Sequence, residues 1–140
     1  MKLIQKHATR WAVAAALLAG ISAHAALADA LKLSGDQEVP PVKTAATGAG
    51  SIMVATDGSV SGSVTTTGLT GTAAHVHTGA VGMNGPVIIP LTKTADGVWS
   101  VPAGAKLGAD QLTAYRAGGL YVNVHTEANK GGEIRTQLTP

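Results

Sequence analysis

The chain has 140 residues, with 10 Lys and Arg, 8 Asp and Glu, and no cysteine. Without cysteine no disulfide can form, and no thiolate is available as a nucleophile or a metal ligand. The formal net charge of +2 does not indicate a nucleic-acid-binding protein, because three of the ten basic residues lie within the first ten positions. The rest of the chain is near neutral, so we expect no nucleic-acid partner.

Residues 1–28 are predicted to be a signal peptide. A basic beginning precedes an apolar stretch at 11–19 that is too short to span a bilayer comfortably. Small residues place the expected cleavage after Ala25 or Ala28. Residues 29–140 then form a single domain without a membrane span, and we expect a periplasmic or secreted protein.

Short runs of β-forming residues, separated by Gly and Asp-Gly, predict an all-β domain after this leader. Asp-Gly pairs favour tight turns between antiparallel strands, and two such pairs lie between β-forming runs. The predicted hairpins join 50–55 to 60–65, and 87–91 to 98–101. The composition therefore favours a β-sandwich or barrel.

One short helix is expected between residues 109 and 117. Asp110 favours its first turn, Leu112 and Tyr115 lie three apart on one face, and Gly118-Gly119 ends it. The last two strands are predicted at residues 120–126 and 133–138. The helix is the one break in an otherwise β-rich pattern.

Three histidines lie in two of the predicted strands. In an extended strand alternate side chains share a face, so His75 and His77 point the same way. Asn123 and His125 share a face in the same manner, about fifty positions later. If these two strands pair, the three imidazoles gather on one surface, which predicts either a metal site or a polar cluster.

Five sequence blocks resemble the CHRD domain, named after chordin, over almost all of the chain after the leader. They are LSGDQEVPPV at 33–42, HVHTG at 75–79, NGPV at 84–87, LYVNVHT at 120–126 and GGEIRTQL at 131–138. The resemblance implies a secreted Greek-key β-sandwich that occurs alone in bacterial proteins and as repeats in chordin. Two positions depart from the usual family pattern, Lys130 in a proline position and Thr136 in a glycine position.

The pattern of two histidines two apart in a Greek-key sandwich is also similar to the copper site of Cu,Zn superoxide dismutase. The fold is thus expected to be immunoglobulin-like or superoxide dismutase-like. The dinuclear site of that enzyme needs a bridging histidine and further His and Asp ligands, which three histidines cannot supply. We therefore do not expect dismutation by that mechanism.

The leading hypothesis is a centre for one copper ion, with zinc as the alternative, because imidazoles without a thiolate suit these two metals. The predicted ligands are His75, His77 and His125. Met83 is a candidate fourth ligand, since its thioether follows His77 in a short loop. Asn123 and Glu127 are predicted acceptors for outer imidazole N–H groups.

Two other functions stay open at this point. The histidines of a structural or protein-binding module would only hydrogen-bond to neighbouring loops, and another exported protein is then the expected partner. A mononuclear metalloenzyme would need an open coordination position beside a cleft. The sequence contains no G-x-S-x-G elbow and no evident carboxylate pair, so no catalytic residues are predicted, and binding is favoured over catalysis.

Overall fold

The structure is a computed structural model that describes residues 30–140, so the predicted signal peptide and its cleavage sites lie outside the described residues. Within this range the chain forms nine β-strands, a short 3-10 helix and one α-helix. In chain order they are β1 (Leu31–Ser34), η1 (Gly35–Gln37), β2 (Thr47–Val54), β3 (Val60–Thr67), β4 (Ala73–Thr78), β5 (Val87–Pro90), β6 (Thr92–Ala95), β7 (Val98–Ser100), α1 (Ala109–Arg116), β8 (Leu120–His125) and β9 (Ile134–Leu138).

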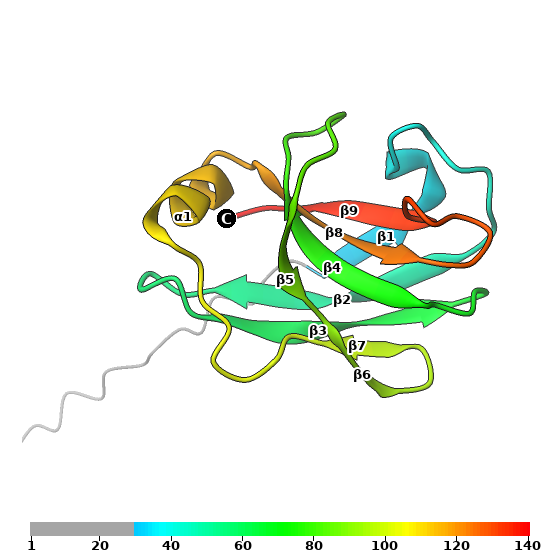
Figure 1. Cartoon of the computed structure of the whole chain (residues 1–140), viewed down its shortest axis with the longest axis horizontal. Helices are drawn as coiled ribbons and strands as arrows, with labels where there is room; N and C mark the ends of the chain where they lie inside the picture. Colours follow the sequence, from blue (N-terminus) through cyan, green and yellow to red (C-terminus); the bar gives the residue numbers. More distant parts are fainter. Residues whose placement is uncertain (1–29) are drawn as a thin grey trace, which may run out of the picture.

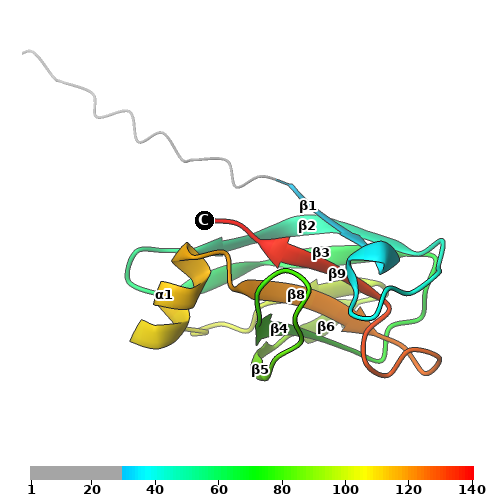
Figure 2. The same cartoon turned by 90° about the horizontal axis from the view of Figure 1, so that it is seen from above.

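All strand pairs are antiparallel, and the order across the sheet is β5-β4-β8-β9-β1-β2-β3-β7-β6. The two edge strands, β5 and β6, are joined through the single residue Leu91, so the sheet curls until it is nearly closed. Figures 1 and 2 show β2 and β3 on one side and β4, β8 and β9 on the other. The late strand β9 lies beside β1 of the β1-β2-β3 meander, which is the spatial order of a Greek key. The predicted all-β sandwich is confirmed.

The first predicted hairpin is confirmed by the pairing of β2 with β3. Their register runs from Thr47 opposite Thr67 to Val54 opposite Val60. In the connecting turn the Asp57 carboxylate accepts a hydrogen bond from the Ser59 backbone N–H at 2.9 Å. Gly58 adopts φ 87°, a left-handed conformation that favours glycine.

The second predicted hairpin is wrong in one of its strands. The Asp96-Gly97 turn does lead into β7, but the partner of β7 is β6, at Thr92–Ala95, and not the run at 87–91. That run forms β5, which pairs with β4 instead. All four residues of β6 are exposed, so β6 lacks the apolar residues by which a strand is usually recognised.

The predicted helix is confirmed as α1, which begins at Ala109 and ends at Arg116. The Gln111 side chain accepts a hydrogen bond from the Gly108 N–H at 2.9 Å and so occupies a free donor at the helix start. Leu112 and Tyr115 pack against the core. Gly118, with φ 73°, ends the helix and leads into β8.

The hydrophobic core lies between the two sides of the curled sheet. Its members include Leu33 and Val64 from one side and Val76, Val122 and Ile134 from the other, each no more than 1% exposed. Along β4 and β8 these apolar residues alternate with the histidines. The core therefore fixes which face of the sheet the histidines occupy.

Candidate metal centre

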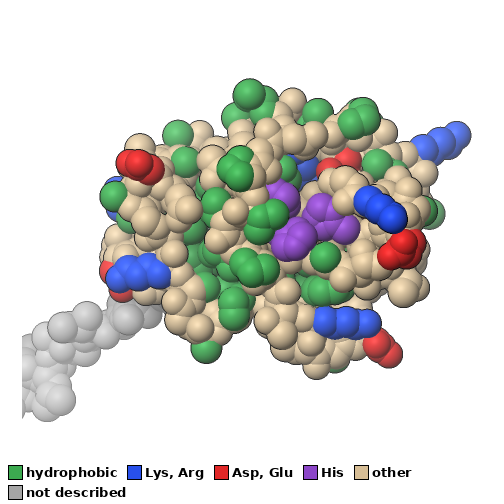
Figure 3. All heavy atoms as spheres, viewed as in Figure 1, with side chains coloured by type: hydrophobic (Ala, Val, Ile, Leu, Met, Phe, Trp, Pro, Cys, Tyr) green, Lys and Arg blue, Asp and Glu red, His purple; other side chains and the backbone are tan. Residues whose placement is uncertain are grey.

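The predicted pairing of the two histidine-bearing strands is confirmed. Strand β4 runs antiparallel to β8, with His75 opposite Asn123, His77 opposite Tyr121 and Ala73 opposite His125. Because side chains alternate across a strand, the three histidines share the face that points away from the core. Figure 3 shows them gathered in one group on this side of the molecule.

The three imidazoles approach one another closely enough to share an ion. Nδ1 of His75 lies 3.0 Å from Nε2 of His125, and one nitrogen from each ring lies within 4.8 Å of the other two. Nitrogens bound tetrahedrally at about 2.0 to 2.1 Å from one metal are about 3.3 Å apart. The wider separations must therefore shorten by about 1.5 Å at most when an ion binds.

Backbone carbonyls hold two of the rings in a tautomer suited to metal binding. Nδ1 of His77 donates a hydrogen bond to the Gly85 carbonyl at 2.9 Å, and Nδ1 of His125 donates one to the Lys130 carbonyl at 2.8 Å. Each ring thus has its proton on Nδ1 and a lone pair on Nε2. Nε2 of His77 is buried and has no hydrogen-bond partner among the described residues, which is the condition of an unused ligand atom.

Burial favours the neutral form of two of the three histidines, His75 and His77. Desolvation lowers the pKa of His75 below its usual value, and the neighbouring His125 and His77 lower it further. Desolvation also lowers the pKa of His77, although the Gly85 carbonyl opposes the shift. Both rings are therefore neutral at pH 7 and can offer a lone pair without first losing a proton.

Tyr121 supports the centre from beside His77. The rings of His77 and Tyr121 stack with centroids 4.7 Å apart and planes 4° from parallel. The guanidinium carbon of Arg135 lies 3.5 Å from the centroid of Tyr121. Two groups at these separations cannot share one ring face, so Tyr121 is held between His77 and Arg135.

The loop at residues 79–86 covers this face of the sheet, and Figure 2 shows it beside β8. Gly85 attaches it twice, because its carbonyl accepts from His77 and its N–H donates to the Tyr121 hydroxyl at 3.2 Å. Arg135 also fixes the loop, with hydrogen bonds to the carbonyl oxygens of Ala80 at 3.1 Å and Met83 at 3.0 Å. The His77 ring and the loop that covers it thus depend on the same contacts.

Sequence reasoning missed the role of Arg135. The sequence pattern gives it no place at the site, but it is only 1% exposed. Its place in β9 is the signal in the sequence that could have indicated this role. Ile134 faces the core there, so the next residue, Arg135, lies on the same face as the histidines. What the pattern does not show is that a loop from elsewhere in the chain covers that second face.

The remaining predicted site residues lie around the centre in different ways. Met83 lies in the covering loop with its side chain 61% exposed, and its ligation stays a prediction. Asn123 is buried, and its amide donates to the Gly131 carbonyl at 3.3 Å. Glu127 is exposed and lies 3.7 Å from the Lys130 ammonium, whereas the outer N–H of His125 uses the Lys130 carbonyl.

Comparison with known families assigns the whole described domain. The CHRD domain family matches residues 30–138. The chain belongs to the CHRD family. The resemblance expected from the five sequence blocks is thereby confirmed, and the described CHRD domain contains the three-histidine cluster on its outer face.

Searches of curated proteins and of solved structures each found no match. Within residues 30–140 of this CHRD domain, no helix is long and apolar enough to cross a membrane.

Proposed function

We propose that this CHRD protein is exported and binds one copper ion through His75, His77 and His125, for storage, delivery or tolerance of the metal. The observation that carries the proposal is the convergence of three imidazoles, two of them oriented by backbone carbonyls. Metal-ligating histidines characteristically donate their outer N–H to such an acceptor. A buried Nε2 without a partner on His77 supports the same conclusion.

The donor set favours copper, with zinc as the alternative. Three nitrogen ligands without a carboxylate or thiolate suit both ions, and the Irving–Williams order places copper above zinc for such a set. The short contact between His75 Nδ1 and His125 Nε2 is a hydrogen bond when no ion is bound. If His75 binds through Nδ1, its proton moves to Nε2 of the same ring, so a neutral ligand results without a net loss of a proton.

The test is a metal titration of the purified protein with elemental analysis. We expect one copper ion per chain, bound more tightly than about 1 μM. Asparagine in place of His77 or His125 keeps an amide donor near the position of Nδ1 and removes Nε2. His77→Asn and His125→Asn should thus weaken binding more than about 100-fold while the backbone hydrogen bonds are retained.

Thr92→Ala, on the exposed strand β6, is the matched control and should leave affinity unchanged. Failure of the wild-type protein to bind copper or zinc with at least micromolar affinity contradicts the proposal.

A structural role for the histidines is the second candidate. It is favoured by the hydrogen bonds that His77 and His125 make to the 79–86 and 126–133 loops, which hold without any ion. This function predicts that His77→Ala lowers the unfolding midpoint and that copper leaves the wild-type midpoint unchanged. Metal binding instead predicts a gain of about 2.7 kcal/mol in the free energy of unfolding at a free copper concentration 100 times Kd.

Export and catalysis are tested separately. Mass spectrometry of the secreted form should find an N-terminus after Ala25 or Ala28, as the leader predicts. The mononuclear metalloenzyme remains a hypothesis without a supporting observation, since the two hollows beside residues 38–41 are lined by none of the three histidines.

A further inference from the structure

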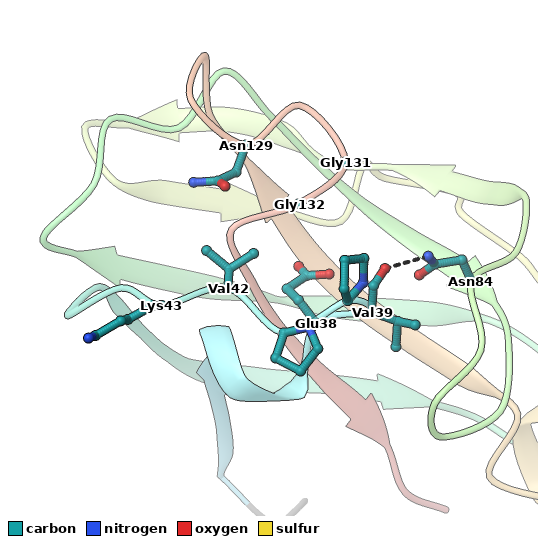
Figure 4. Close-up of a pocket in the computed structure, with 10 residues that line it drawn as sticks. Glu38, Val39, Val42, Lys43, Asn84, Asn129, Gly131 and Gly132 are labelled. Carbon is teal, nitrogen blue, oxygen red and sulfur yellow. Dashed lines mark hydrogen bonds between the residues drawn. The ribbon is translucent and has the colours of Figure 1, made fainter.

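A cavity of about 510 Å³ lies beside the metal centre, between the segment that follows η1 and the loop that joins β8 to β9. Glu38 and the residues after it form one wall, and Asn129, Gly131 and Gly132 form the opposite wall (Figure 4). Its volume falls in the range of sites that hold small molecules. None of the three histidines lines it.

Glu38 is the unusual residue of this cavity. Its side chain is 96% buried, being only 4% exposed, and its Oε1 has no hydrogen-bond partner among residues 30–140. Figure 4 shows the carboxyl group at the centre of the cavity, directed towards Gly132. A buried carboxyl oxygen without a donor costs free energy that a ligand can recover by donating a hydrogen bond.

The nearby cation does not meet this need. Arg135 is close enough to favour the charged form of Glu38, but its hydrogen bonds go to the 79–85 loop and to Gln137. Lys43 also lines the cavity, yet Figure 4 shows its ammonium pointing away from Glu38. Arg135 thus favours the ionised form of Glu38 through its charge, and Oε1 of Glu38 keeps no hydrogen-bond partner among the described residues.

Gly132 leaves space for the carboxyl group of Glu38 in the cavity. Its φ is 127°, and a Cβ at this position would meet Oε1 of Glu38 and Nδ2 of Asn123. The glycine therefore leaves the carboxyl group against the bare backbone. Burial raises the pKa of Glu38 to about 7, against opposing effects of Asn123 and Arg135, so a donor cation that binds there stabilises the ionised form.

The walls indicate what is attached to the donor. Val39, Pro40, Pro41 and Val42 contribute aliphatic surface along one side, which suits a chain of methylene groups. The polar end of such a ligand must carry hydrogen-bond donors. An acceptor facing the carboxylate of Glu38 would be repelled by it. A primary ammonium on an unbranched aliphatic stem has both properties.

We propose that this cavity is a binding site for a primary alkylammonium group, with the Glu38 carboxylate as its anchor and the 39–42 segment packed against its stem. The group comes either from a free amine or from a lysine side chain of another protein. The site is separate from the metal centre, so the proposal stands whether or not copper binds.

The test follows backbone amide signals by NMR while pentylamine is added to the purified protein. We expect saturable shifts at residues 38–43 and 129–132, and we expect none with 1-pentanol, which has the same stem and no charge. Glu38→Gln should weaken pentylamine binding roughly 10- to 100-fold, because a hydrogen bond to a charged group is lost. Its unfolding midpoint verifies that the variant is folded.

Glu127→Gln is the matched control, since it removes one exposed carboxylate from the neighbouring loop; it should bind pentylamine as the wild type does. Titration with Nα-acetyl-lysine amide distinguishes the two sources, because only a site open to a protein lysine accepts this capped residue. The proposal is overturned if pentylamine shows no saturation below about 10 mM, if 1-pentanol gives equal shifts, or if Glu38→Gln binds as tightly as the wild type.

Discussion

The outer faces of the two sides of the sheet differ although their strands alternate in the same way. On β3 the polar residues Ser61, Thr65 and Thr67 face solvent, while Val60 and Val64 face the core. On β8 all residues from Leu120 to Val124 are buried, because loops cover the second face. The same alternation of polar and apolar residues thus gives a solvent-exposed polar face on one side of the sheet. On the other side it gives a polar face that is buried beneath loops.

The two sides of the sheet also differ in the polar groups that they bury. The solvent-facing side has the ordinary construction of an antiparallel sheet with one wet face. On the covered side, buried polar groups must find partners. Among the described residues, Nε2 of His77, Oε1 of Glu38 and Oδ1 of Asn123 have none, and the first two of these atoms belong to the two proposed binding sites.

The largest change in the free energy of unfolding is expected when Arg135, on the covered face, is replaced. Arg135→Ala removes the hydrogen bonds to the 79–85 loop and leaves a void beside Tyr121, so we expect a loss of about 4 kcal/mol in the free energy of unfolding. Thr65→Ala, on the wet face, should change it by less than about 0.5 kcal/mol. Urea denaturation of both variants measures the contrast. Equal effects would mean that the covered side is not a second interior.

Glu38→Gln should change how the stability of the covered side depends on pH. The pKa of Glu38 in the folded protein is raised to about 7 from 4.5, so the folded state binds a proton that the unfolded state has already lost. Stability therefore falls as pH rises from about 4.5 through 7, by up to about 3 kcal/mol. The glutamine variant lacks this loss and should match the wild type at pH 4 and exceed it at pH 8.

The measurement is the free energy of unfolding of both proteins across this pH range. A parallel pH dependence of the two proteins would refute the assignment to Glu38.

Gly132→Ala tests the close packing beneath the loop between β8 and β9. A Cβ at Gly132 would meet Glu38 and Asn123, and the backbone has a positive φ. Gly104 also has a positive φ, of 80°, but an added Cβ there meets nothing within 4 Å. We expect Gly132→Ala to cost about 2 kcal/mol more than Gly104→Ala in thermal or urea unfolding, because of overpacking and because φ 127° lies further from the left-handed region than φ 80° does. Similar costs would contradict the close packing of Gly132 against Glu38 and Asn123.

The smallest effect is an acid-side decline in stability caused by the histidines. Burial lowers the pKa of His75 and His77 in the folded protein, so the unfolded state binds more protons below about pH 6.5. Stability of the metal-free protein should fall as pH drops from that value. In His77→Asn the decline should be shallower, which the slope of unfolding free energy against pH measures. An unchanged slope would contradict a neutral, buried His77.

Much of the fold could be predicted from local sequence. The Asp57-Gly58 turn fixes the β2-β3 hairpin, and Gly118 marks the end of α1. The histidine cluster could be predicted because side chains alternate along a strand. Once β4 pairs with β8, the three histidines must lie on the same face of the sheet. Strand β6 was missed since none of its residues is buried.

The surroundings of the site could not be predicted in the same way. The acceptors for His77 and His125 are backbone carbonyls of Gly85 and Lys130, and every residue has such a carbonyl, so the sequence does not distinguish them. The burial of Glu38 and Arg135 depends on how loops fold over a face, which strand periodicity does not describe. Loop placement is the information that the structure adds.

The separation of the ligands along the chain has a consequence for when the centre can exist. His75 and His77 are close in sequence, but His125 follows His75 by 50 positions and approaches it only when β4 pairs with β8. If the three histidines bind an ion as proposed, an unfolded chain offers only His75 and His77, and His125 joins them late, with long-range sheet closure. Full occupancy of the centre would thus report that the domain has completed its folding.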